Sequence, residues 1–138
     1  YRERSEPLPG AVELVSGLLA GGQRLAVASS SIEPWVEACL DRIGLRSHFE
    51  LLVTGSDVER GKPEPDIYLQ AAHRLGVDPT RCLAFEDAPA GIESAKRAGM
   101  TVWAVRTEYT RGLVLPGPHR EFESLCDVEL DAILGVAA

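Results

Sequence analysis

Short apolar runs alternate with longer helical patterns along the chain, and this alternation limits the folds open to it. Four compact runs lack strict apolar-polar alternation, which is typical of strands buried on both faces. They lie at residues 25–28, 51–54, 82–85 and 101–105. Apolar residues recur at helical spacing around these runs, with proline near several starts and glycine after the ends. The order of the elements predicts an α/β fold, a parallel sheet with right-handed crossovers and helices on both faces.

The helical patterns predict which side chains face the core. The predicted helices cover residues 9–20, 34–43, 65–75 and 90–98. Their expected buried faces are Val12, Val15, Leu18 and Leu19, then Trp35, Val36, Cys39, Leu40 and Ile43, then Ile67, Leu69, Ala71, Ala72 and Leu75. Residues 108–121, which are rich in glycine and proline, predict a long surface loop before a short last helix at residues 127–134.

Composition excludes some classes of function. The formal net charge is −7, from 14 basic and 21 acidic residues, which argues against non-specific nucleic-acid binding. No apolar run approaches the roughly 18 residues of a membrane span, so no membrane partner is expected. Cys39, Cys82 and Cys126 form no CxxC pair. We expect free, buried thiols in a reducing compartment, and hence a cytoplasmic protein.

Hydroxyl groups follow the first predicted strand at Ser29, Ser30 and Ser31. Ligands of open parallel sheets bind beyond the carboxyl ends of the strands. Hydroxyls and free backbone N–H groups at such a point can form an anion site. The same serines would also suit an N-cap cluster for the helix at residue 34. The residues alone leave both interpretations open.

A single lysine, Lys62, lies between Gly61 and Pro63, and Pro65 follows closely. The prolines stiffen the backbone and limit where the ammonium group can point. This suits a fixed cationic role, such as neutralising a phosphate. The alternative is an exposed lysine on a turn. Because the chain has only one other lysine, Lys96, the placement slightly favours the functional interpretation.

Two adjacent carboxylates, Glu86 and Asp87, follow the third predicted strand. Carboxylates at the end of a buried strand are costly unless they are paired or bound to a metal. Mg²⁺ needs only one or two protein carboxylates because it keeps several waters. In the alternative, Asp87 is a helix N-cap and Glu86 pairs with a basic group. The two interpretations are evenly matched on these residues.

The three sites follow one another in an order that resembles a known family. Residues 28–31, 61–66 and 85–92 resemble the second, third and fourth motifs of the haloacid dehalogenase-like superfamily, most closely its β-phosphoglucomutase-like branch of phosphatases and mutases. The resemblance covers residues 7 to about 105 and implies a Rossmann-like core. It implies that Ser29 and the backbone N–H of Ser30 bind a phosphoryl oxygen and that Lys62 neutralises the phosphoryl group.

The resemblance also implies a metal and a reaction. Asp87 would bind Mg²⁺ with support from Glu86. The implied function is magnesium-dependent hydrolysis of a small phosphomonoester, such as a sugar phosphate, through an aspartyl-phosphate. Ser29 and Lys62 would be the catalytic residues of this chain, and a small phosphorylated metabolite would be its partner. Ile32 and Glu33 stand where some mutases carry Lys-Asn for a second phosphate, which favours hydrolysis over a mutase reaction.

One part of the family pattern is missing. The nucleophile of the family lies in an Asp-x-Asp motif after the first strand, and no Asp-x-Asp occurs in this chain. The chain starts at Tyr1 rather than at a methionine. We therefore expect residues 1–138 to be the C-terminal portion of a core domain, without its first strand and helical cap. That strand is central in the family sheet, so we expect an N-terminal segment or a second chain to fill its place.

Other functions compete with hydrolysis. The main alternative is a truncated, non-catalytic homologue that binds phosphate or a partner without turnover. A dehalogenase of the same fold is disfavoured by the Glu86-Asp87 pair, because a metal site helps phosphate chemistry and does little for halide displacement. The spacing of the motifs fits a response-regulator-like receiver poorly.

Overall fold

A computed structural model of the chain describes residues 10–107, 115 and 117–137. Its helices are α1 (Ala11–Ala20), α2 (Glu33–Arg42), α3 (Asp66–Leu75), α4 (Pro89–Arg97) and α5 (Leu130–Ala137). Its strands are β1 (Ala26–Ser29), β2 (Leu51–Thr54), β3 (Leu83–Glu86), β4 (Thr101–Val105) and β5 (Arg120–Phe122). The four predicted strands and five predicted helices are all present, with ends within a few residues of the expected ones.

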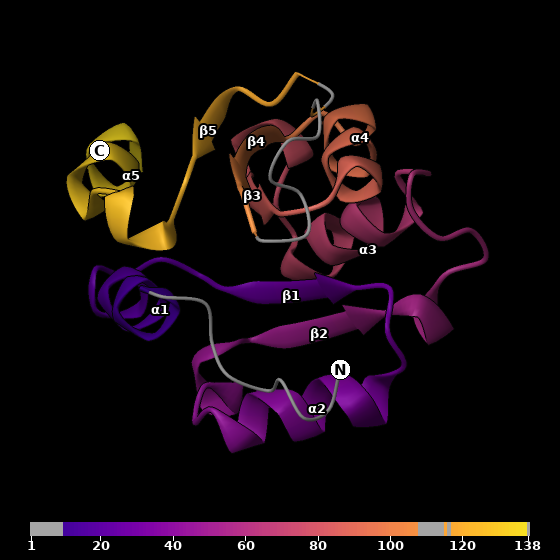
Figure 1. Cartoon of the computed structure of the whole chain (residues 1–138). Helices are drawn as coiled ribbons and strands as arrows, with labels where there is room; N and C mark the ends of the chain where they lie inside the picture. Colours follow the sequence, from indigo (N-terminus) through magenta and orange to yellow (C-terminus); the bar gives the residue numbers. More distant parts are fainter. Residues whose placement is uncertain (1–9, 108–114, 116, 138) are drawn as a thin grey trace.

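The strands form two separate groups, and the strands within each group run parallel (Figure 1). Strand β1 pairs with β2, so that Ala28 lies opposite Val53. Strand β3 pairs with β4, which pairs in turn with β5. Every pairing is parallel, and helices separate the successive strands β1 to β4. The predicted parallel α/β class is therefore confirmed.

The two groups of strands are not hydrogen-bonded to each other within the described part of the chain. Strand β1 pairs with β2 along one edge, and its other edge has no strand partner among these residues. In the same way, β3 pairs with β4 along one edge and has no strand partner along the other. Side chains along β1 are all half-buried, whereas the last three residues of β2 are buried. Strand β1 is therefore less well covered than a central parallel strand normally is.

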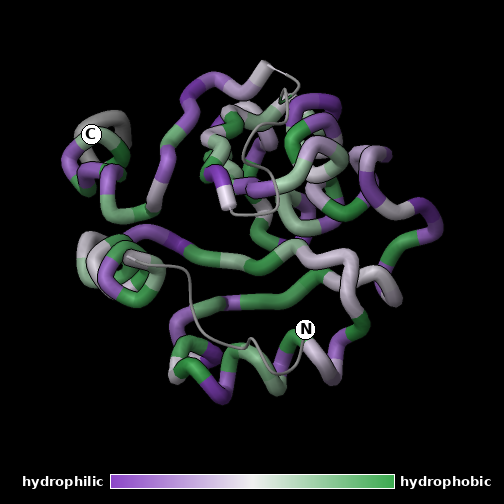
Figure 2. Tube along the Cα trace, viewed as in Figure 1, coloured by the Kyte–Doolittle hydropathy of each residue, from purple (hydrophilic) through white to green (hydrophobic). Residues whose placement is uncertain are grey.

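Apolar side chains gather in two clusters, and Figure 2 shows the hydrophobic stretches that supply them. One cluster joins β2, β3 and β4 to α3 and α4, with Val53, Ile67 and Ile92 fully buried. The other cluster packs Trp103 and Phe122 against α1 and the start of α5. Helices α1 and α5 lie side by side in Figure 1. Helices thus cover both faces, as predicted.

The predicted buried faces of the helices are partly wrong. Helix α1 buries Leu14 and Leu18, while Val12 is 37% and Leu19 44% exposed. Helix α3 buries Tyr68, and the neighbouring Leu69 is 41% exposed. Trp35 in α2 is likewise exposed. The buried residues of α1 and α3 recur at a spacing of four, as in Leu14 with Leu18 and Tyr68 with Ala72, so apolar residues beside them remain accessible.

The tail differs from the predicted loop. Residues Arg120–Phe122 form β5 and extend the sheet beside β4. Phe122 is buried, and its ring centroid lies 5.5 Å from that of Trp103. Burial of this aromatic pair, together with the backbone pairing, makes the segment a strand despite its charged residues. Most of the predicted loop, residues 108–114 and 116, lies outside the described residues.

Two further predictions concern the cysteine thiols and the possibility of a membrane-spanning helix. None of the three cysteines forms a disulfide with the described residues, as expected, but Cys126 is exposed and Cys39 and Cys82 are only half-buried. The expectation of buried thiols is therefore wrong. Among the helices that the structure describes, none has the length and apolar character needed to cross a membrane.

Candidate active site

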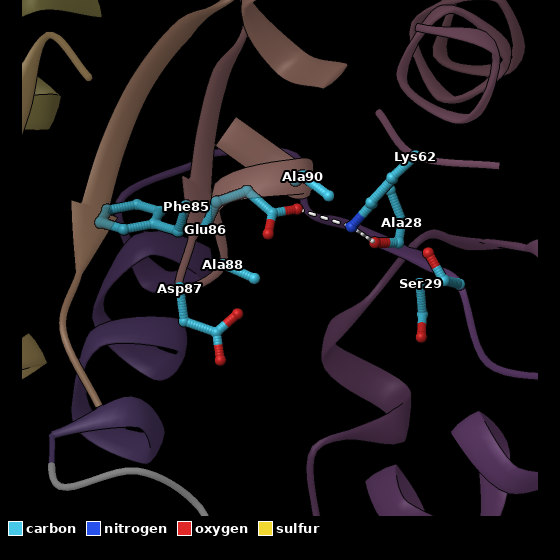
Figure 3. Close-up of a pocket in the computed structure, with 10 residues that line it drawn as sticks. Ala28, Ser29, Lys62, Phe85, Glu86, Asp87, Ala88 and Ala90 are labelled. Carbon is cyan, nitrogen blue, oxygen red and sulfur yellow. Dashed lines mark hydrogen bonds and ion pairs between the residues drawn. The ribbon is translucent and has the colours of Figure 1, made fainter. Parts of the chain in front are cut away.

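The predicted site residues meet at one pocket, although they are far apart in the sequence. The pocket lies beyond the carboxyl ends of β1 and β3, which is where open parallel sheets bind ligands. Figure 3 shows Lys62 between Glu86 on one side and Ala28 with Ser29 on the other. The lining residues are Ala28, Ser29, Ser30, Lys62, Phe85, Glu86, Asp87, Ala88, Ala90 and Gly91.

Ser29 is the last residue of β1 and begins a tight loop. Its Oγ accepts a hydrogen bond of 3.2 Å from the backbone N–H of Ser31. The loop packs closely on the next segment, since a Cβ at Gly55 would lie 2.7 Å from the carbonyl oxygen of Ser30. Helix α2 begins at Glu33 with Ile32 as N-cap and no side-chain cap. The N-cap interpretation of the serines is therefore wrong.

The segment that carries Lys62 is anchored to α4. Ser94, which is fully buried in α4, donates a hydrogen bond of 2.6 Å to the backbone carbonyl of Glu64. On the outer side, the Arg60 guanidinium donates to both carboxylate oxygens of Asp66, at 3.0 and 3.2 Å. The Ser94 hydrogen bond ties the backbone just after Lys62 to α4, and the Arg60–Asp66 ion pair bridges the segment across Lys62.

Lys62 links the two groups of strands. Its Nζ donates to Glu86 Oε2 at 2.6 Å, at the end of β3, and to the carbonyl oxygen of Ala28 in β1 at 3.2 Å. The side chains of Lys62 and Glu86 are only 13% and 7% exposed, so solvent screens this ion pair weakly. The alternative of an exposed lysine on a turn is wrong.

Tyr68, which was not predicted as a site residue, adds a hydrogen bond to the ion pair. Tyr68, buried in α3, donates its hydroxyl to the same Glu86 Oε2. Burial, and then the charge of Glu86, raise the pKa of Tyr68 well above its ordinary range. The phenol therefore stays protonated and acts as a donor. A buried tyrosine requires a partner for its hydroxyl, and that requirement was the available signal.

Asp87 is exposed and lies at the pocket, beyond the end of β3. It does not cap α4, whose N-cap is Ala88 without a side-chain hydrogen bond. The N-cap alternative for Asp87 is therefore wrong, whereas the pairing of Glu86 with a basic group is observed. Within the described residues, no group of three or more His, Cys, Asp or Glu is placed to hold a metal ion. Asp87 could supply one carboxylate to Mg²⁺, and Glu86 is engaged by Lys62 and Tyr68.

Replacement of Lys62 by methionine should destabilise the protein, because it leaves the Glu86 carboxylate buried without its cation. We expect Lys62→Met to lower the free energy of unfolding by about 3 kcal/mol in urea denaturation. The double variant Lys62→Met/Glu86→Gln should regain at least ~1 kcal/mol, because a neutral amide is cheaper to bury than a charge. A single variant as stable as the wild type, or a double variant no better than the single one, would contradict a stabilising role for the pair.

The match to a family model extends over most of the chain, and several relatives share its fold. A model described as haloacid dehalogenase-like hydrolase matches residues 1–99. YhcW of Bacillus subtilis (strain 168) is 39% identical over 132 residues, which cover 96% of this chain and 60% of that protein. Fructose-1-phosphate phosphatase YqaB of Escherichia coli (strain K12) is 43% identical over 101 residues, covering 73% of this chain and 53% of that protein.

A solved structure of a related protein has a similar fold. A variant of CbbY from Rhodobacter sphaeroides, in complex with xylulose-(1,5)bisphosphate, superposes with a TM-score of 0.83 and 34% sequence identity. The match covers 87% of this chain and 55% of that one. The chain thus spans between 53% and 60% of the length of these three relatives. On the family match and the shared fold, the chain belongs to the haloacid dehalogenase-like hydrolases.

Proposed function

We propose that the protein to which this chain contributes hydrolyses small phosphomonoesters in a magnesium-dependent reaction. The observation that carries the proposal is the convergence of Ser29, Lys62 and Asp87 on one pocket at the ends of β1 and β3. A hydroxyl, an ammonium group and a carboxylate are the parts that phosphoryl transfer needs for positioning and charge stabilisation. The family of the chain supports the same chemistry.

In the proposed reaction the phosphoryl group sits between Ser29 and Lys62. The Ser29 hydroxyl and the Ser30 backbone N–H donate to phosphoryl oxygens, and the Lys62 ammonium offsets their negative charge. A carboxylate from outside residues 1–138 attacks phosphorus, the alcohol leaves, and water then hydrolyses the aspartyl-phosphate. Lys62 would also lower the repulsion between the attacking carboxylate and the phosphoryl oxygens.

A bound Mg²⁺ would supply further neutralisation of phosphoryl charge. Asp87 fits as one of its ligands, because its carboxylate lies at the pocket and makes no side-chain hydrogen bond or ion pair with the described part of the chain. Mg²⁺ is commonly held by one or two carboxylates together with waters and substrate phosphates. In this proposal Glu86 supports the metal site indirectly, because its carboxylate is held by Lys62 and Tyr68.

The proposed substrates are sugar phosphates or similar metabolites. This class is supported by the relatives, one a fructose-1-phosphate phosphatase and another solved with a sugar bisphosphate. Glu33, in the first turn of α2, places a negative charge four residues after Ser29. A second phosphate would be repelled there, which supports hydrolysis over transfer between two phosphorylated positions. A cytoplasmic location belongs to the proposal, supported by three cysteines that form no disulfide with the described residues.

A further strand between β1 and β3 is also proposed, supplied by an N-terminal segment or a second chain. The support is that β1 and β3 each have an edge without a strand partner among the described residues, and that the ends of both strands line one pocket. A strand in that position would end at the pocket and could carry the missing carboxylate there. It would also cover the half-buried side chains of β1.

Hydrogen exchange of the intact natural protein tests the further strand. Alternate N–H groups of a parallel strand point to opposite neighbours. If both sides of β1 and β3 are paired, consecutive amides in Ala26–Ser29 and Leu83–Glu86 should all exchange slowly, as core amides do. Rapid exchange of every second amide in these strands would show that the edges remain open, and would contradict the proposal.

The activity is tested by phosphate release from a panel of small phosphomonoesters with the intact natural protein and Mg²⁺. Lys62→Ala should lower kcat/KM about 100-fold or more, because it removes a charge that stabilises the transition state. The matched control is Lys96→Ala, which removes the other lysine of the chain from α4, outside the pocket. Chelation of the metal, or Asp87→Asn, should cause a comparable loss.

The same assay decides between turnover and binding alone. If the wild type binds inorganic phosphate but releases none from any ester, the non-catalytic alternative replaces hydrolysis. If Lys62→Ala keeps wild-type activity, the assigned role of Lys62 is contradicted even where hydrolysis is observed.

A further inference from the structure

Tyr68 holds the Glu86 carboxylate by a hydrogen bond from its buried hydroxyl. The Tyr68 hydroxyl and Lys62 Nζ donate to the same oxygen, Glu86 Oε2. The Lys62 Nζ also lies 5.1 Å from the centroid of the Tyr68 ring, a distance at which the ring attracts a cation. Tyr68 is 6% exposed and does not line the pocket, so it acts on a ligand indirectly, through neighbours such as Lys62 and Glu86.

The Glu86 carboxylate also lies against Gly91. A Cβ at position 91 would lie 1.9 Å from Oε1, 2.2 Å from Cδ and 2.6 Å from Oε2 of Glu86. The backbone of Gly91 is not in the left-handed region, so its conformation does not require glycine. Glycine within a helix lowers helix stability relative to alanine. The close approach of Glu86 is therefore the feature that explains this residue.

The geometry leaves Lys62 with one uncommitted donor. An ammonium group has three N–H donors, and two are used by Glu86 and the Ala28 carbonyl. These two contacts fix the ammonium group at the pocket wall. The direction of the third N–H therefore depends on where the Glu86 carboxylate is held.

We propose that Tyr68 and Gly91 are positioning residues that fix the Glu86 carboxylate and thereby aim the third N–H of Lys62 into the pocket. The target of that N–H, a phosphoryl oxygen, rests on the proposed function. Tyr68 holds Glu86 by a hydrogen bond, and Gly91 allows it the space to lie over the first turn of α4. Tyr68 does not line the pocket, and Gly91 borders it without a side chain that could bind a ligand.

Hydrogen exchange of the lysine ammonium groups tests this assignment without any substrate. In NMR spectra of the intact natural protein labelled with heavy nitrogen at lysine Nζ, the Lys62 signal is identified by its loss in Lys62→Met. Because Lys62 is held by two acceptors, its ammonium protons should exchange slowly with water. Tyr68→Phe and Gly91→Ala should each speed that exchange about tenfold, the factor expected for loss of a hydrogen bond to a charged group.

The matched control is Ile67→Val, on the same helix. Ile67 is fully buried beside Tyr68, so the variant loosens the same part of the core but keeps the hydroxyl. It should leave the Lys62 exchange rate within about twofold of the wild type. If Tyr68→Phe behaves like this control, the positioning role of Tyr68 is overturned. If Ile67→Val speeds the exchange as much as Tyr68→Phe, the effect is general loosening and the assignment also fails.

Measurement of kcat/KM beside the exchange rate distinguishes the positioning role of Tyr68 and Gly91 from the proposed function. With an active wild type, Tyr68→Phe should lower kcat/KM about tenfold, in step with its effect on Lys62 exchange. A wild type that hydrolyses nothing, yet shows the expected exchange pattern, contradicts the proposed function and supports the positioning role. An active wild type whose Lys62 exchange is unchanged in both Tyr68→Phe and Gly91→Ala supports the function and overturns the positioning role.

Discussion

The ion pair between Lys62 and Glu86 is the interaction on which the pocket depends, because it connects the ends of two strands that do not pair. Lys62 reaches Glu86 at the end of β3 and the Ala28 carbonyl in β1. Removing both charges from water is costly, and such a pair is favourable only with good geometry and additional hydrogen bonds. Tyr68 supplies one of them. One lysine thus joins the two halves of the site and leaves a donor for a ligand.

The fold and the main site residues could be predicted because the signals for them are local. Short apolar runs and glycine-terminated helical patterns give a parallel sheet, and a parallel sheet brings the ends of its strands to one edge. Because Ser29 ends β1 and Asp87 follows β3, both residues were expected at the end of the sheet where the strands finish. The prolines around Lys62 restrict the backbone of a short connection, but its place at the site was predicted from the resemblance of residues 61–66 to a family motif.

What could not be predicted depends on contacts between distant segments. Tyr68 and Leu69 are neighbours in α3, and only the packing of α3 against β1, β2 and α4 decides that the tyrosine is buried and the leucine exposed. Gly91 resembles an ordinary small helix residue until Glu86 is found against it. Strand β5 has a charged sequence, and its place in the sheet follows from the burial of Phe122 beside Trp103.

The central claim is that Ser29 and Lys62 bind a phosphoryl group in this pocket. The most direct test is a crystal structure of the intact natural protein with tungstate, a phosphate-like anion that anomalous scattering locates without ambiguity. We expect a tungstate ion within hydrogen-bond distance, about 3 Å, of both Lys62 Nζ and Ser29 Oγ. A tungstate ion bound elsewhere, with the pocket between β1 and β3 filled by side chains or left without an anion, would contradict the account.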